Sequence, residues 1–203
     1  SAASGTPLLL NQDFVSANVI ADANGAISRS LTLNMDLPTD RVIVQRDVYL
    51  TRNLTVTQGQ LQFHRNNATA YADLTITDAS LDVTVVNDLA VGTNGSIRTG
   101  TANQRHQLDV FGNATFNGTA YFTQRTAADI SNEATDGIVD LNFLNQATDQ
   151  TVACNAEVRF YRIEIDKSAP TVFLNITSTS ASNFNLFGFA NDGFDTDFEV
   201  GGV

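Results

Sequence analysis

Apolar and polar residues alternate along most of this chain, and the helical spacing of apolar residues is almost absent. Such alternation is typical of β-strands, whose successive side chains point to opposite faces of a sheet. The pattern predicts short strands at residues 42–44, 48–50, 54–57, 61–63, 74–77, 81–85, 89–91, 108–111, 114–116, 120–122, 139–143, 158–160, 163–165 and 172–176. We therefore expect an all-β protein.

Pairs of residues that favour turns separate these segments. Examples are Gln58-Gly59, Asn94-Gly95 and Asn117-Gly118. Glycine and asparagine tolerate the positive φ angles that tight turns need, so we expect a turn at each pair. Many short strands separated by such turns are typical of a sandwich, a barrel or a β-solenoid.

A weak internal repeat favours the solenoid. Four related tetrads, LTVT, LTIT, LAVG and LDVF, begin at Leu54, Leu74, Leu89 and Leu108. In each tetrad the first and third residues would point inward and stack on the same positions of the next tetrad, which predicts one continuous ladder. The irregular intervals suit a parallel β-helix whose turns vary in length. A β-sandwich is the alternative, because it could give a similar spacing.

The two ends of the chain differ from its central part. Residues 1–45 are interpreted as an N-terminal β cap or docking segment, 46–183 as the body of the solenoid, and 184–203 as an aromatic and acidic tail or last coil. The ends of a solenoid leave backbone hydrogen-bonding groups open, so a neighbouring copy could pair there. The predicted partner-docking residues are the apolar side chains of the tail, Phe184, Leu186, Phe187 and Phe189.

The balance of charges excludes several classes of partner. Asp and Glu number 22 against 11 Lys and Arg, and the net charge is −11. Nucleic-acid binding needs clustered cations, which no part of the sequence collects, so no nucleic-acid partner is expected. No apolar run is long enough to span a bilayer, so no membrane insertion is expected.

The acidic tail holds the best candidate for a metal site. Asp192, Asp195, Asp197 and Glu199 offer the oxygen ligands that calcium prefers, and Gly193 permits a tight turn between them. Their spacing differs from that of an EF-hand loop, so a solvated acidic end is the alternative. Calcium is the one ion that the sequence suggests, and no other cofactor is expected.

No catalytic constellation is visible. The sequence lacks the motifs of P-loop, dinucleotide-binding, α/β-hydrolase and zinc-peptidase enzymes. Acidic groups such as Asp82 with Asp109, or Asp140 with Glu164 and Asp166, could serve glycan cleavage. Isolated aspartates at outward positions and in turns are nevertheless expected in a chain so rich in Asp.

The remaining reactive side chains have ordinary structural explanations. Cys154 lies in an apolar, strand-like stretch and is expected to be a small buried hydrophobe. His64 and His106 each stand next to an arginine in polar segments, and we expect both to be solvated surface residues. We therefore predict that the protein is not an enzyme.

A series of segments in the second half of the chain resembles a known family. The segments are GIVDLNF at 137–143, DQTV at 149–152, FYRIEIDKS at 160–168 and VFLNIT at 172–177. They resemble the repeats of large secreted, adhesin-like parallel β-helix proteins of Bacteroidota, in the style of type IX secretion cargo. The resemblance covers residues 50–180. It implies a right-handed parallel β-helix exported to the cell surface and used in adhesion, gliding or matrix formation.

These observations lead to one functional hypothesis and one alternative. The hypothesis is an extracellular or cell-surface structural and adhesive protein that forms a homo-oligomer or homopolymer, as a filament or matrix subunit, with surface glycans as a further partner. The alternative is a carbohydrate-binding or carbohydrate-active β-helix module. A groove lined with aromatic and acidic residues on one face would favour the alternative.

Overall fold

The computed structural model describes residues 8–10, 30–44, 48–50, 52–64, 82–100, 104–128, 137–145, 147–188 and 198–202. In these residues the chain forms seventeen β-strands and no helix, so the predicted all-β class is confirmed. This part of the chain contains no helix long and apolar enough to cross a membrane.

The larger sheet contains eleven strands. Its main path runs through β1 (Leu8–Leu10), β3 (Arg41–Val44), β5 (Leu54–Phe63), β7 (Leu89–Thr99), β10 (Thr119–Tyr121), β13 (Val158–Phe160) and β16 (Phe184–Leu186). Off this path, β5 also pairs with β2 (Leu31–Asn34), and β7 pairs with β9 (Ala114–Phe116), which is followed by β12 (Gln150–Cys154) and β15 (Leu174–Ser178).

The smaller sheet contains six strands. In spatial order they are β4 (Val48–Leu50), β6 (Asp82–Val85), β8 (Arg105–Val110), β11 (Ile138–Phe143), β14 (Arg162–Lys167) and β17 (Phe198–Gly202). Every pairing between these named strands, in both sheets, is parallel. Parallel neighbours cannot be joined by a hairpin, and from β3 onward the chain passes through the other sheet before it returns beside an earlier strand.

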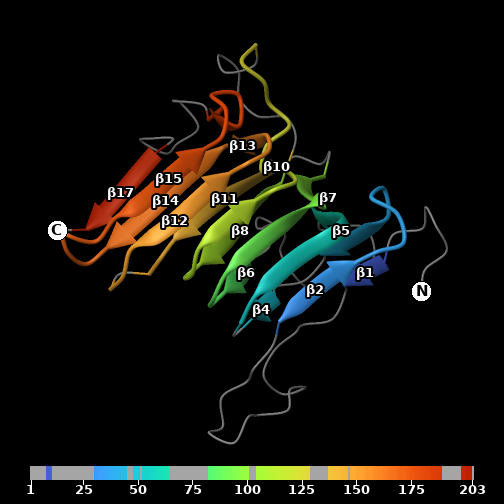
Figure 1. Ribbon diagram of the computed structural model, residues 1–203, viewed down its shortest axis with the longest axis horizontal. Coiled ribbons are helices and arrows are strands. Elements are labelled where there is room, and N and C mark those ends of the chain that lie inside the picture. The colour runs from blue at the N-terminus through green and yellow to red at the C-terminus, as the bar shows by residue number, and fades with distance from the viewer. Residues whose placement is uncertain are drawn as a thin grey trace, which may run out of the picture.

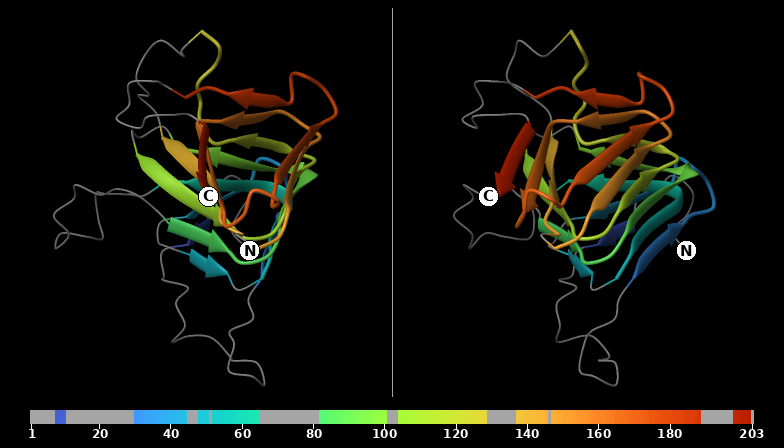
Figure 2. Two further views of the ribbon diagram at one scale, coloured as in Figure 1. Left: turned by 90° about the vertical axis from the view of Figure 1, so that its left-hand side faces the viewer. Right: turned by 60° about the vertical axis from the view of Figure 1, so that its left-hand side comes forward.

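The strands run side by side and curve around one interior, so that they form a nearly closed, barrel-like wall (Figure 1, Figure 2). The prediction of a right-handed parallel β-helix with β caps was wrong, and the all-parallel pairing also overturns the β-sandwich alternative. The arrangement is closer to the parallel barrel of α/β proteins than to a β-helix, although the described residues contain no helix.

Inward side chains from both sheets fill the interior. In the larger sheet, Leu54, Leu89, Ala114 and Val152 are register partners in turn, and all four are buried. The largest fully buried side chains are Tyr161, Phe63, Phe116, Phe122, Phe143 and Phe160. Burial of this apolar surface is the main force that stabilises the fold.

The stacking order differs from the predicted ladder of tetrads. The ladder was expected to place Leu54 beside the Leu74 tetrad, but the register partner of Leu54 is Leu89, and the next partner of Leu89 is Ala114. Leu108 lies in the other sheet, opposite Leu141, and Leu74 lies outside the described residues. Alternation identifies each strand but not the sheet to which it belongs, because an inward apolar row has the same pattern in both sheets.

Two of the predicted turns are bends inside long strands. Gln58-Gly59 lies within β5 and Asn94-Gly95 within β7, and the two glycines are register partners. Gly59 has a φ angle of 100°, which favours glycine. A Cβ atom at Gly95 would collide with the carbonyl oxygen of Val56. Glycine therefore allows the larger sheet to bend sharply here while its parallel pairing continues.

Candidate functional site

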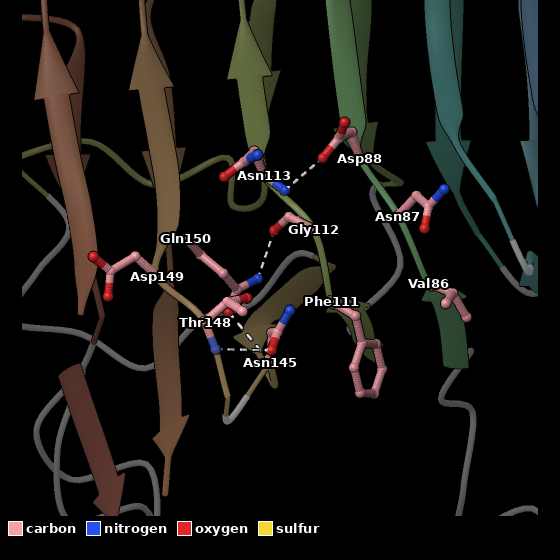
Figure 3. Close-up of a pocket in the computed structure, with 10 residues that line it drawn as sticks. All are labelled: Val86, Asn87, Asp88, Phe111, Gly112, Asn113, Asn145, Thr148, Asp149 and Gln150. Carbon is pink, nitrogen blue, oxygen red and sulfur yellow. Dashed lines mark hydrogen bonds between the residues drawn. The ribbon is translucent and has the colours of Figure 1, made fainter. Parts of the chain in front are cut away.

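A polar pocket lies at the corner where the chain leaves the smaller sheet for the larger one (Figure 3). Its volume is about 320 Å³. Three turns that follow β6, β8 and β11 supply its walls. The lining residues are Val86, Asn87, Asp88, Phe111, Gly112, Asn113, Asn145, Thr148, Asp149 and Gln150.

Side chains at this corner hold the successive turns to one another. The backbone N–H of Asn113 donates to Asp88 Oδ1 at 2.8 Å, a bond drawn in Figure 3. The N–H of Thr151 donates to Asn113 Oδ1 at 2.8 Å, and the N–H of Phe173 donates to Asp149 Oδ1 at 2.8 Å. These Asp and Asn side chains therefore cap the start of the next strand, and each keeps its second polar atom for solvent or a ligand.

A buried lysine lies beneath the pocket. Lys167 is 5% exposed, and its Nζ donates to Gln150 Oε1 at 2.6 Å and to the carbonyl oxygen of Asn145 at 2.7 Å. Burial lowers the pKa of Lys167, and the charges of Asp149 and Asp166 oppose that shift. The ammonium group thus fixes the loop that forms one wall of the pocket, and burial removes it from reach of a ligand.

The pocket offers mainly hydrogen-bonding groups to a ligand. Its exposed groups are carboxylates, amides and the hydroxyl of Thr148, and Phe111 gives it one aromatic wall. The described residues contain no group of three or more His, Cys, Asp or Glu side chains that could hold a metal ion. A small polar ligand such as a sugar suits this lining.

A second polar surface covers the outer side of β3, β5, β7, β10 and β13. We call it the arginine–tyrosine face, and it consists of Arg41, Gln60, Gln62, Arg98, Tyr121, Glu157 and Arg159. Gln62, Arg98, Tyr121 and Arg159 are register partners across four neighbouring strands. They therefore form one row that crosses the sheet.

Hydrogen bonds fix the centre of this face. Tyr121 donates its hydroxyl to Glu157 Oε2 at 2.8 Å, and Arg159 Nε donates to Glu157 Oε1 at 2.8 Å. The guanidinium of Arg159 lies over the Tyr121 ring, 4.3 Å from its centroid. Burial raises the pKa of Tyr121, and the hydrogen bond to Glu157 adds to the shift. Burial alone would raise the pKa of Glu157, but the bonds from Arg159 and Tyr121 outweigh it and lower that pKa.

The smaller sheet carries charges that neutralise one another. Arg105 bonds Asp140 through Nε at 2.6 Å and through Nη2 at 3.1 Å. Arg162 Nη1 lies 3.4 Å from Glu164 Oε2. Asp109 Oδ1 accepts hydrogen bonds from the side chains of Gln107 and Asn142, both at 2.8 Å.

Three of the acidic groups considered for glycan cleavage are bonded to neighbouring side chains. Asp109, Asp140 and Glu164 each meet a cation or an amide. The backbone of Asp82 lies opposite Gln107 and not opposite Asp109. Asp166 lies in β14, where its charge acts on Lys167.

Most of the predicted calcium ligands cannot be placed. Asp192, Asp195 and Asp197 lie outside the described residues. Glu199 lies in β17, as the register partner of Glu164 in β14. The calcium site therefore stays a prediction.

The predicted docking residues lie at one edge of the larger sheet, except for Phe189, which is outside the described residues. Phe184 and Leu186 belong to β16 and are half-buried against the core. The Phe184 ring lies 5.0 Å from the Phe160 ring, centroid to centroid. The backbone N–H of Phe187 donates to the carbonyl oxygen of Phe160 at 2.8 Å.

The reactive side chains have mixed outcomes. Cys154 is buried as predicted, and burial raises the pKa of its thiol to about 11. The prediction of a solvated surface histidine was wrong for His106, which points inward from β8 and is buried, with its ring 5.9 Å from that of Phe63. His64 follows β5 and is half-buried.

The arginine–tyrosine face was missed from the sequence, although a signal for it exists. Arg98, Tyr121 and Arg159 each follow a buried apolar residue within a strand, which marks them as outward positions. Tyr121 lies 23 residues after Arg98, and Arg159 lies 38 residues after Tyr121, so only the register brings them into one row.

Comparisons with protein-family models, with curated proteins and with solved structures find no match to this chain. The resemblance to the repeats of Bacteroidota adhesins therefore stays a prediction from the residues that suggested it.

Proposed function

We propose that this is an extracellular or cell-surface structural and adhesive protein, without catalytic activity, that assembles by adding copies end to end. The observation that carries the proposal is the open edge formed by β15 and β16. Among the described strands, β15 pairs with β12 alone and β16 pairs with β13 alone. Each edge strand therefore has a row of N–H and C=O groups that a further strand could use.

Apolar side chains accompany this open edge. Phe173 is 54% exposed and Ile176 is 36% exposed, which makes them two of the few large hydrophobic residues at the described surface. Contact with another protein would remove this apolar surface from water and stabilise the complex.

The register of the larger sheet suggests which surface of a second copy would fit. One inward row begins at Leu31 in β2, continues through Leu54 in β5 and ends at Ile176 in β15. β1, β2 and β4 lie at one end of the row of strands, and β15 and β17 lie at the opposite end (Figure 1). A second copy that placed its β2 beside β15 would continue the apolar row and the parallel pairing.

The proposed absence of catalysis is supported by how the carboxylates are used. In the described parts of both sheets, Asp140, Glu157 and Glu164 are bonded to arginines, and Asp88 and Asp149 cap turns. General acid–base work needs a carboxyl group that is within reach of a substrate and can exchange its proton.

Substitution of Ile176 tests the assembly. Ile176→Lys places a charge on the open edge, and because the side chain is partly exposed we expect the monomer to stay folded. Negative-stain electron microscopy and mass photometry should show fibres or oligomers for the unchanged protein and monomers for the variant. Ala127→Lys is the matched control, because it adds the same charge to an exposed turn between β10 and β11. Assembly that is equal in the two variants would contradict a role for this edge.

A carbohydrate-binding module is the second candidate function. The observation that favours it is the Tyr121 ring, which lies half-exposed on a sheet face between Arg98 and Arg159. Aromatic and arginine side chains held in place by their neighbours are typical anchors of binding surfaces. A glycan array that includes neutral and charged sugars tests this function, and an array without signal would contradict it.

A further inference from the structure

We propose that the arginine–tyrosine face binds an anionic polysaccharide, one that carries carboxylate or sulfate groups. The inference rests on the second candidate function and names its ligand class. It does not depend on the open edge, because the two surfaces lie on different parts of the larger sheet.

The geometry of the row suits an extended chain. Arg98, Tyr121 and Arg159 are register partners on β7, β10 and β13. Neighbouring strands lie about 4.8 Å apart, so the two guanidinium-bearing positions are about 10 Å from each other. A polymer that crosses the strands would meet the guanidinium of Arg98 and then the Tyr121 ring with the Arg159 guanidinium lying over it.

Two of the three arginines of this face are held by amides instead of carboxylates. Arg41 Nη1 donates to Gln62 Oε1 at 3.2 Å, and Arg98 Nη1 donates to Gln60 Oε1 at 3.2 Å. Neither arginine forms an ion pair with a carboxylate of the described residues. Both guanidinium groups are thus positioned by neutral amides and keep their full charge.

This arrangement contrasts with the rest of the molecule. The net charge of the chain is −11, with 22 acidic residues available as counterions. On the smaller sheet, Arg105 and Arg162 do meet carboxylates. Three arginines with the single carboxylate of Glu157 therefore leave a positive face on an acidic protein, and a positive surface attracts and orients anionic ligands.

The face is also rigid where a ligand would touch it. The bonds from Tyr121 and Arg159 to Glu157 hold the ring and the guanidinium in place before any ligand arrives. Less side-chain freedom is then lost on binding. Arginine presents a planar set of donors that matches carboxylate and sulfate oxygens.

A nucleic acid fits these observations less well than a polysaccharide. Nucleic acids carry a phosphate at every nucleotide, and their binding draws on extended sets of cations. Here Arg41, Arg98 and Arg159 stand in a strongly acidic protein. Three arginines are enough to contact a polysaccharide whose charges are more widely spaced than the phosphates of a nucleic acid.

The test is retention on immobilised polysaccharides. Polygalacturonate supplies carboxylates, dextran sulfate supplies sulfates, and unmodified dextran is the neutral comparison. We expect the protein to bind at least one of the charged polymers at low salt, not to bind dextran, and to lose affinity as sodium chloride rises. Binding to one charged polymer alone would identify which anionic group is recognised.

Variants locate the site. Arg98→Gln should weaken binding about tenfold, the effect of losing one charge-assisted contact. Tyr121→Leu, which keeps the charges and removes the ring, should also weaken it. Arg52→Gln is the matched control, because it makes the same charge change at an exposed residue outside the face, and it should leave affinity unchanged. Circular dichroism melting of each variant checks that the fold is retained.

Three results would overturn the inference. Equal weakening by Arg98→Gln and Arg52→Gln would mean that net charge alone governs retention. Equal binding to dextran would leave a carbohydrate-binding function but remove its anionic specificity, whereas no binding to any polysaccharide would remove both. Tighter binding to a single-stranded oligonucleotide than to either charged polymer would assign the face to nucleic acid.

Discussion

Some buried residues of this protein are polar, although the alternation of apolar and polar residues predicts apolar side chains at buried positions. Gln150 is 1% exposed, yet its Nε2 donates to the carbonyl oxygens of Val110 and Gly112, and its Oε1 accepts from Lys167. A buried polar group costs little when all its bonds are formed. The sequence offers no sign of this network, because its members come from three separate stretches of the chain.

Cys154 is a residue whose environment was predicted from the sequence, since the apolar alternation around it marks an inward position. Burial raises the pKa of its thiol to about 11, so almost no thiolate exists at neutral pH. We expect a thiol reagent such as DTNB to react with Cys154 very slowly in the folded protein and more quickly as pH rises toward 11. The absorbance of the released thiolate measures the rate.

Unfolding in guanidinium chloride provides the control for this experiment. The same thiol should then react at the rate of an ordinary exposed cysteine. Fast reaction without denaturant would mean that β12 opens readily or that Cys154 is not buried.

At the scale of elements, strand positions were largely predictable, but the ends of strands were not. Glycine and asparagine occur at tight turns and also at bends of a sheet, because both kinds of site need a backbone with little steric hindrance. These residues therefore do not show which of the two a segment forms. At Asn94-Gly95 the bend prevails, since the flanking residues remain paired with β5 on one side and with β9 and β10 on the other.

Gly118 tests the importance of these bends. It lies between β9 and β10, and a Cβ atom there would collide with the carbonyl oxygens of Gly92 and Gly95. Gly118→Ala should therefore destabilise the protein by about 1–3 kcal/mol, as overpacking does elsewhere. Asn117→Ala, a change at the exposed neighbouring residue, should cost less. Urea unfolding followed by circular dichroism compares the two, and equal midpoints would show that the bend has room for a side chain.

For the whole molecule, the sequence predicted the all-β class but not how the strands close. Closure depends on which strands become neighbours, and register partners such as Val91 and Phe116, or Leu108 and Leu141, share no distinguishing sequence feature. The candidate surfaces depend on the same information. The predicted docking tail supplies β16 of the open edge, whereas β15 and the arginine–tyrosine face were not among the predicted surfaces.

The net charge of −11 bears on assembly as well. Copies that approach end to end repel one another, and salt screens that repulsion. We therefore expect association to increase with sodium chloride, as measured by mass photometry. Calcium chloride at the same ionic strength should promote association further, because the acidic tail is predicted to bind calcium.

If the two salts increased association equally at matched ionic strength, screening of the repulsion would explain the whole effect. That result would contradict the predicted calcium site. Association that falls as either salt is added would show instead that attraction between charges, not contact between apolar edges, holds the copies together.

The buried position of Lys167 has a practical consequence for anyone handling this protein. It is the single lysine of the sequence, and its amine is held by Gln150, Asn145 and Thr148. Amine-directed chemistry, such as coupling to a sensor chip, fluorophore esters or aldehyde fixation, finds no lysine amine on the folded surface. Modification of Lys167 would therefore identify molecules in which its contacts with Asn145, Thr148 and Gln150 have opened.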